Sequence, residues 1–151
     1  MSTPTSRPTG RTSRAATFAA AYVLLRSSAD LADHWIQTDH QADTKADRSP
    51  HGRRACAAHV ATYTAVQAAA LVLGGRALGL RPKPRRVIAA LALSASTHYL
   101  ADRREPLRRA AEATRRGNFL RLADHGMNGG YILDQAFHHV VETCAALIVA
   151  R

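Results

Sequence analysis

The stretch YILDQAFHHVVET (residues 131–143) decides the fold assignment of this chain, because it is apolar and polar at once. Asp134, Gln135, His138 and Glu142 are interspersed there with Tyr, Ile, Leu, Phe and Val. Asp134 and His138 are four residues apart, which puts both side chains on one face of a helix, one turn apart. A solvated stripe, a buried hydrogen-bond network and a metal site are all open explanations for such a helix.

Three further Ala-rich apolar segments precede this one, over residues 15–37, 55–74 and 87–101, and the last segment runs over 131–150. Their Ala and Leu content favours helix, and they lack the alternation and β-branched clusters of strands. Clusters of Pro and Gly separate the segments. The sequence therefore predicts an all-α fold, a four-helix membrane-type bundle.

A fifth, short helix of another kind is expected over residues 105–116. Glu105 with Arg109, and Glu112 with Arg116, are i,i+4 pairs in the favourable order for an exposed helix face. Gly117 is typical of a helix end. We expect an amphipathic basic helix on the surface.

The length of 151 residues suits a single domain. Residues 1–14 are rich in Ser, Thr, Pro and Arg, which predicts a disordered basic arm and leaves 15–151 for the helical bundle domain. The apolar run after the arm also resembles a signal peptide ending at Ala29. Because the polar pattern continues from Asp30 as one helix, we expect the segment to be retained.

Lys and Arg total 21 against 11 Asp and Glu, for a formal net charge of +10. This charge favours partners that carry phosphate, either anionic lipid or nucleic acid. Aromatic residues make up only 5%, so a base-stacking platform for single strands is poorly supplied. The two cysteines form no C-x-x-C pair, which argues against a zinc ribbon or a redox motif.

A membrane span needs about 20 apolar residues. Residues 55–75 contain no formal charge, whereas the other three segments are shorter or carry charged residues. Composition alone leaves a membrane bundle and a soluble bundle both open.

Each helical segment carries carboxylate or imidazole groups that a bundle can direct toward its interior. His98 and Asp102 repeat the i,i+4 spacing of Asp134 and His138. Facing helices of bundles assemble metal sites from such groups, and this donor set suits zinc, manganese or iron. The candidate ligands are Asp33, His59, His98, Asp102, Asp134 and His138, with His34, Gln37 and Gln135 as candidate supporting residues around them. The alternative is a set of hydrogen bonds that only fixes helix register.

The motifs ADHWIQTDHQADTK, HYLAD and DQAFHH, with His59 between the first two, resemble a bacterial family of small multi-helix membrane proteins known as domain of unknown function 3307. The resemblance runs from about residue 30 to residue 150. It implies a membrane setting and no established activity. The positions that match the family pattern are Asp33, Gln37, Asp39, Lys45, His59, His98, Asp102, Asp134, Gln135 and His138.

Together these patterns predict a small membrane protein with a buried His/Asp centre that binds a divalent metal, and the enzyme class that fits is a metal-dependent hydrolase of unknown substrate. We expect the bacterial inner (cytoplasmic) membrane, with membrane lipid as a partner and a homo-oligomer as a further one. The alternative is a soluble or peripheral cytoplasmic protein that binds nucleic acid or anionic lipid through its Arg-rich helix. The candidate anion-binding residues are Arg103, Arg104, Arg108, Arg109, Arg115 and Arg116.

Overall fold

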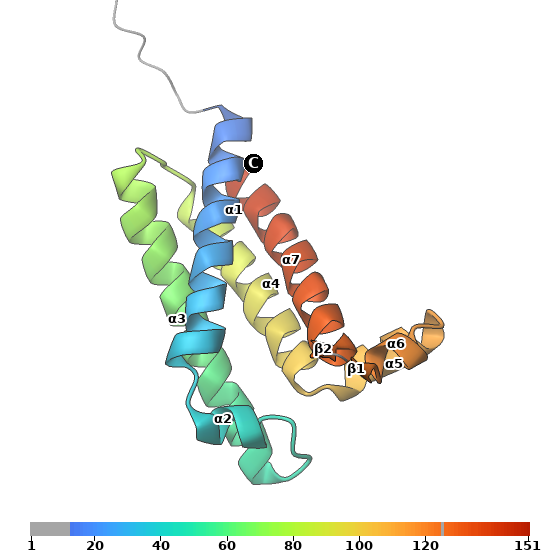
Figure 1. Cartoon of the computed structure of the whole chain (residues 1–151). Coiled ribbons are helices and arrows are strands. Elements are labelled where there is room, and N and C mark those ends of the chain that lie inside the picture. The colour runs from blue at the N-terminus through green and yellow to red at the C-terminus, as the bar shows by residue number, and fades with distance from the viewer. Residues whose placement is uncertain (1–12, 125) are drawn as a thin grey trace, which may run out of the picture.

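The computed structural model describes residues 13–124 and 126–151, and most of them are helical (Figure 1). The elements in chain order are α1 (Arg14–Leu31), the π-helix η1 (Ala32–Ile36), α2 (Asp39–Thr44), α3 (Pro50–Ala77), α4 (Pro84–Asp102), α5 (Glu105–Ala113), α6 (Gly117–Leu120), β1 (Ala123–Asp124), β2 (Met127–Asn128) and α7 (Gly129–Ala150). The two strands are two residues long and pair as an antiparallel hairpin. The prediction of an all-α fold is confirmed.

The long helices α1, α3, α4 and α7 form a helical bundle in which α1 and α4 each pack against both α3 and α7 (Figure 1). The small elements α5, α6 and the hairpin lie together where α4 ends and α7 begins. Helix α2 packs against the first turns of α3. One end of the bundle is therefore surrounded by short elements. The predicted arm lies largely in residues 1–12, outside the described residues.

Helix α3 begins at Pro50, five residues before the predicted start. Pro50 and Gly52 suggest a helix break in the sequence, but Ser49 caps the helix here, and both residues lie in its first turn. The Ser49 hydroxyl accepts a hydrogen bond from the Gly52 N–H at 3.1 Å, and proline is well suited to the first helical position. A Cβ atom at Gly52 would clash with the backbone oxygen of Asp47. Glycine there lets the segment before α3 lie directly against the helix.

The short basic helix is shorter than the prediction of 105–116. Helix α5 ends at Ala113, and Arg115 adopts a left-handed φ of 59°, which a continuing helix does not allow. Glu105 pairs with Arg109 at 2.9 Å as predicted, but Glu112 pairs with Arg108 at 2.7 Å instead of Arg116. The expected Glu112–Arg116 pair was wrong because Arg116 lies beyond the end of the helix.

The inside of the bundle changes character along its length. One part is a conventional apolar core, made of Ala21, Leu25, Leu71, Ala90, Ala145, Ala146 and Val149. Toward the end that carries the short elements, the buried side chains become polar and include three histidines. The bundle thus buries polar and ionisable residues at one end and apolar residues at the other.

Two of the described helices, α3 and α7, are long and apolar enough to cross a membrane by length and composition. Large apolar side chains also face outward on all four long helices: Val23, Leu73, Ile88 and Val140 are each at least 60% exposed. Each long helix therefore carries at least one large apolar side chain on the outside of the bundle.

Candidate metal centre

The first functional side chain is positioned by a π-turn at the end of α1. The Gln37 N–H donates to the Ala32 carbonyl at 2.9 Å, which is the i→i+5 bond of a π-helix. The wider turn rotates the side chains that follow, so Asp33 points inward with 14% exposure while Trp35 is 84% exposed. Such turns are frequent at functional sites, and nothing in the sequence pattern predicted this one.

Four side chains from η1, α3 and α4 converge on one point, and we call Asp33, His59, His98 and Asp102 the His/Asp cluster. The Nε2 atoms of His59 and His98 lie 2.9 Å apart. Asp33 Oδ1 lies 3.2 Å from Nε2 of His59 and 3.4 Å from Nε2 of His98. Asp102 Oδ2 lies 3.4 Å and 3.2 Å from the same two nitrogens. Two imidazole nitrogens and two carboxylate oxygens therefore share one small space.

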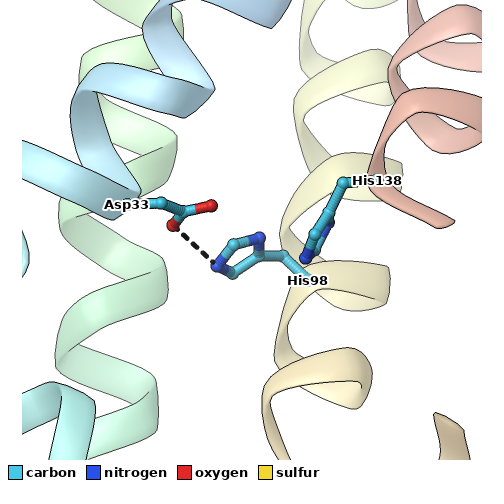
Figure 2. A group of neighbouring side chains, drawn as sticks. All are labelled: Asp33, His98 and His138. Carbon is cyan, nitrogen blue, oxygen red and sulfur yellow. Dashed lines mark ion pairs between the residues drawn. The ribbon is translucent and has the colours of Figure 1, made fainter. Parts of the chain in front are cut away.

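His138 on α7 lies directly behind this cluster. Its ring centroid is 4.5 Å from that of His98, and Figure 2 shows the two rings on the same side of the Asp33 carboxylate. Asp33, His98 and His138 can each offer one ligand atom within 4.8 Å of the others, and so can His59, His98 and Asp102. His98 belongs to both groups, so it is the central residue of the site.

Asp134 does not join the His/Asp cluster. Its Oδ2 atom lies 3.5 Å from Nε2 of His138, a long distance for a hydrogen bond, and its side chain is 24% exposed. The spacing of four therefore brought the pair together as expected, but only His138 faces the other histidines. Among the described residues, Asp134 belongs to neither group of potential ligands.

Several buried polar atoms at this site lack a hydrogen-bond partner among the described residues. They are Asp33 Oδ1, Asp102 Oδ2, His98 Nδ1 and His138 Nε2. Buried polar atoms without partners are rare in native proteins, because losing water without replacing its hydrogen bonds is costly. The two carboxylate atoms are those that approach the imidazole nitrogens, so a bound cation would satisfy both.

Lys45, at the end of α2, holds the second carboxylate in place. Its Nζ atom lies 2.7 Å from Oδ1 of Asp102, which leaves Oδ2 facing the histidines. In the amide orientation that suits its neighbours, Gln37 accepts a hydrogen bond from the Lys45 ammonium at 2.8 Å and donates to the Asp33 carbonyl at 3.2 Å. Gln37 thus contacts the backbone of Asp33 and the lysine that holds Asp102.

The other two candidate supporting residues lie elsewhere. His34 contacts the Asp30 carbonyl at 2.9 Å and the Tyr131 hydroxyl at 3.0 Å. Gln135 accepts a hydrogen bond from Arg26 at 3.2 Å. Neither residue is hydrogen-bonded to a member of the His/Asp cluster. Asp39, which the family pattern also suggested, is exposed at the start of α2.

A second buried network, absent from the predicted site, lies next to the cluster. Arg26 pairs with Glu142 at 3.1 Å, and the Tyr63 hydroxyl donates to Glu142 at 3.3 Å. The Tyr63 ring stacks on His98 at a centroid distance of 3.8 Å. Glu142 follows His138 by one helical turn, so the same i,i+4 rule could have found it.

Three of the six predicted anion-binding arginines are occupied by internal contacts. Arg103 donates to the carbonyls of Lys45, at 2.5 Å, and Asp47. Arg108 and Arg109 both bind Glu105, and their hydrogen bonds lower the pKa of Glu105 to about 2. Arg104 makes no ion pair or side-chain hydrogen bond within the described chain, and the remaining two candidates, Arg115 and Arg116, are exposed.

Comparison of the chain with protein-family models, with curated proteins and with solved structures finds no match. The resemblance to domain of unknown function 3307 therefore stays a prediction, and the function is argued from the geometry alone.

Proposed function

We propose that this chain is a helical membrane protein that binds one divalent metal ion through the His/Asp cluster. The observation that carries the proposal is the set of five distances, between 2.9 and 3.4 Å, that link two imidazole nitrogens and two carboxylate oxygens. Zinc binds nitrogen and oxygen ligands at about 2.0–2.2 Å in tetrahedral sites. Tetrahedral ligands at such distances lie roughly 3.3–3.6 Å from one another, close to the separations in the cluster.

The ligand types support the same proposal. Imidazole and carboxylate together suit zinc, manganese or iron. The orphaned oxygens of Asp33 and Asp102 are the atoms that an ion would satisfy. Lys45 on Asp102 is the kind of outer contact that fixes a ligand's orientation.

His138 is assigned a supporting role or a place as a further ligand. It lies within reach of Asp33 and His98, but its Nε2 atom faces Asp134 at 3.5 Å. We propose Asp33, His59, His98 and Asp102 as the primary ligands, since each carboxylate oxygen lies within 3.4 Å of both Nε2 atoms.

The reaction class that fits such a centre is metal-assisted hydrolysis. A bound divalent ion would supply Lewis-acid catalysis and a lowered pKa for water. Asp33 and Asp102 also line a pocket, so a substrate bound there would lie beside two of the proposed ligand residues.

The membrane part of the proposal rests on α3, α7 and the outward apolar residues. The half-buried Arg26, the buried Glu142 and the His/Asp cluster face the interior of the bundle, where charged groups of a membrane protein are found in pairs. We place the chain in the bacterial cytoplasmic membrane, with membrane lipid around the four long helices.

Elemental analysis of the purified protein tests the metal proposal. Wild-type protein is expected to hold about one equivalent of zinc, manganese or iron, and His98→Gln is expected to lose most of it. His139→Ala is the matched control, because His139 adjoins His138 but is exposed. Wild-type protein that stays folded and binds none of the three metals when they are supplied would overturn the proposal.

A further inference from the structure

A pocket of about 980 Å³ opens beside the His/Asp cluster. Asp33 and Asp102 form part of its wall, and the rest comes from the segment around Lys45, the turn between α4 and α5, and the start of α7. This volume lies at the upper end of the range for small-molecule sites, about 300–1,000 Å³. A ligand in the pocket would contact the pocket side of Asp33 and Asp102 and the basic turn together.

Basic side chains outnumber carboxylates in this pocket. The basic residues are Lys45, Arg48, Arg103, Arg104, Arg108 and Arg109, and the acidic ones are Asp33, Asp102, Glu105 and Asp134. Two of the acidic residues are proposed metal ligands, so a bound divalent ion would offset their charge. The loaded pocket would therefore carry a positive potential, which favours an anionic ligand.

The internal contacts decide which cation is available to that ligand. Lys45 is held by Asp102, and Arg103 is held by two backbone carbonyls. Arg108 and Arg109 share Glu105, and Arg48 pairs with the same carboxylate at 3.7 Å. Arg104 lines the same pocket, is exposed, and has no such partner in the part of the chain that the structure describes.

The backbone at Arg104 is strained. Its φ of 57° lies in the left-handed region, which disfavours side chains other than those of Gly, Asn and Asp. A strained residue persists where the surroundings enforce it, and such residues cluster at binding and catalytic sites.

We infer that the pocket binds a phosphate ester, whose phosphate group contacts Arg104 and lies against the metal centre. The inference rests on the proposed function, because two of the proposed metal ligands, Asp33 and Asp102, form part of the pocket wall. A guanidinium binds phosphate through two parallel hydrogen bonds, and a divalent ion binds phosphate oxygens directly. A phosphate monoester carries close to two negative charges near neutral pH, which matches the excess of positive charge better than a single carboxylate does.

Binding to zinc-loaded protein in an uncharged detergent tests the inference. The soluble probe is glycerol 3-phosphate, the lipid probe is phosphatidic acid in the same micelles, and glycerol and phosphatidylcholine are the uncharged controls. Saturable binding of glycerol 3-phosphate would identify a soluble ester, and binding of phosphatidic acid alone would identify a lipid headgroup. Both results support a phosphate-ester site.

The decisive comparison is between Arg104→Gln and Arg115→Gln. Arg115 is also exposed and also left-handed, with a φ of 59°, but it does not line the pocket. Loss of a charged hydrogen bond costs enough to weaken binding about 10-fold or more, so we expect that loss for Arg104→Gln only. The zinc content of both variants should equal that of the wild type.

Three results would overturn the proposed function or this inference. If the wild type binds no metal, the proposed function fails. If the zinc-loaded wild type binds the phosphate probes no better than the uncharged controls, this inference fails while the metal centre stands. If Arg104→Gln and Arg115→Gln weaken binding equally, the attraction is a diffuse effect of net charge, and the assigned site is overturned.

Discussion

The Nε2 atoms of His59 and His98 lie 2.9 Å apart, although the two residues are separated by 39 positions in the chain. A hydrogen bond between two neutral imidazoles could explain this one contact, but it would leave the facing oxygens of Asp33 and Asp102 without partners. A shared ion explains all four atoms together.

Chelation is expected to destabilise the wild-type protein. Without the ion, two buried carboxylates lose the cation that offsets them, which penalises the folded state. Returning the metal at about 100 times its dissociation constant should restore about 2.7 kcal/mol of stability. The measurement is the melting temperature in detergent before and after dialysis against a chelator. His98→Gln should show no such response, and a wild type equally indifferent to chelation would contradict the prediction.

Replacing Lys45 with Met is expected to weaken metal binding. The ammonium holds one oxygen of Asp102 at 2.7 Å, so its loss lets the carboxylate rotate away from the histidines. Removing an outer contact of a ligand typically costs about 10-fold or more in metal affinity. The variant also removes the repulsion between the Lys45 ammonium and the ion, which would strengthen metal binding. We expect the loss of Asp102 orientation to have the larger effect on metal affinity, because Asp102 is buried.

Competition with a chromophoric chelator measures this affinity. Arg48→Gln is the control, since Arg48 lies on the same segment but is largely exposed and contacts Glu105 at 3.7 Å. An unchanged affinity in Lys45→Met, or an equal loss in both variants, would show that Lys45 does not position the ligand.

Spacing within a single helix was a reliable guide to this site. His98 and Asp102 meet as predicted, and so do Asp134 and His138. Spacing cannot say which pairs face each other across the bundle, because that depends on the rotation of each helix about its axis. For this reason Asp134 was grouped with the cluster although it contacts only His138 among the predicted ligands.

The remaining differences have local physical causes. The π-turn that directs Asp33 inward has no sequence signature, since it is one extra residue per turn stabilised by tertiary contacts. Helix α3 begins earlier than expected because Ser49 caps it, and α5 ends earlier because the chain turns at Arg115. Apolar periodicity located the helices, whereas capping and backbone conformation set their ends.

Replacing Arg104 with Gly is expected to stabilise the fold. Glycine adopts a φ of 57° without the steric cost that a side chain meets there, a gain on the order of 1 kcal/mol. The melting temperature should exceed those of the wild type and of Arg104→Gln. Phosphate binding should nevertheless be lost in both variants. A glycine variant that is no more stable than Arg104→Gln would mean that the backbone there carries no strain.

The pKa of Glu105 reports whether Arg108 and Arg109 are occupied. Their hydrogen bonds lower this pKa to about 2, so the ion pairs are fully formed above the ordinary pKa of 4.5 and are lost as pH falls through about 2. In the double variant Arg108→Gln, Arg109→Gln, the pKa should return toward 4.5. Carboxyl-carbon NMR measures both values. A wild-type pKa near 4.5 would mean that these arginines are free, and it would favour the alternative in which they bind nucleic acid or anionic lipid.

The outward apolar residues predict how the chain meets a membrane. Val140 lies near the middle of α7 and is 63% exposed, so in the membrane setting it faces lipid. An arginine at the centre of a membrane-spanning helix costs about 2.5–3.5 kcal/mol, whereas at an exposed site of a water-soluble helix it costs almost nothing. Wild-type chain should stay with carbonate-washed membranes, and Val140→Arg should be extracted or degraded. Met127→Arg is the control, because Met127 is 46% exposed in the hairpin outside the long helices. Recovery of folded, monodisperse wild type and Val140→Arg from the soluble fraction would defeat the membrane assignment. It would leave the His/Asp cluster as the centre of a soluble helical protein.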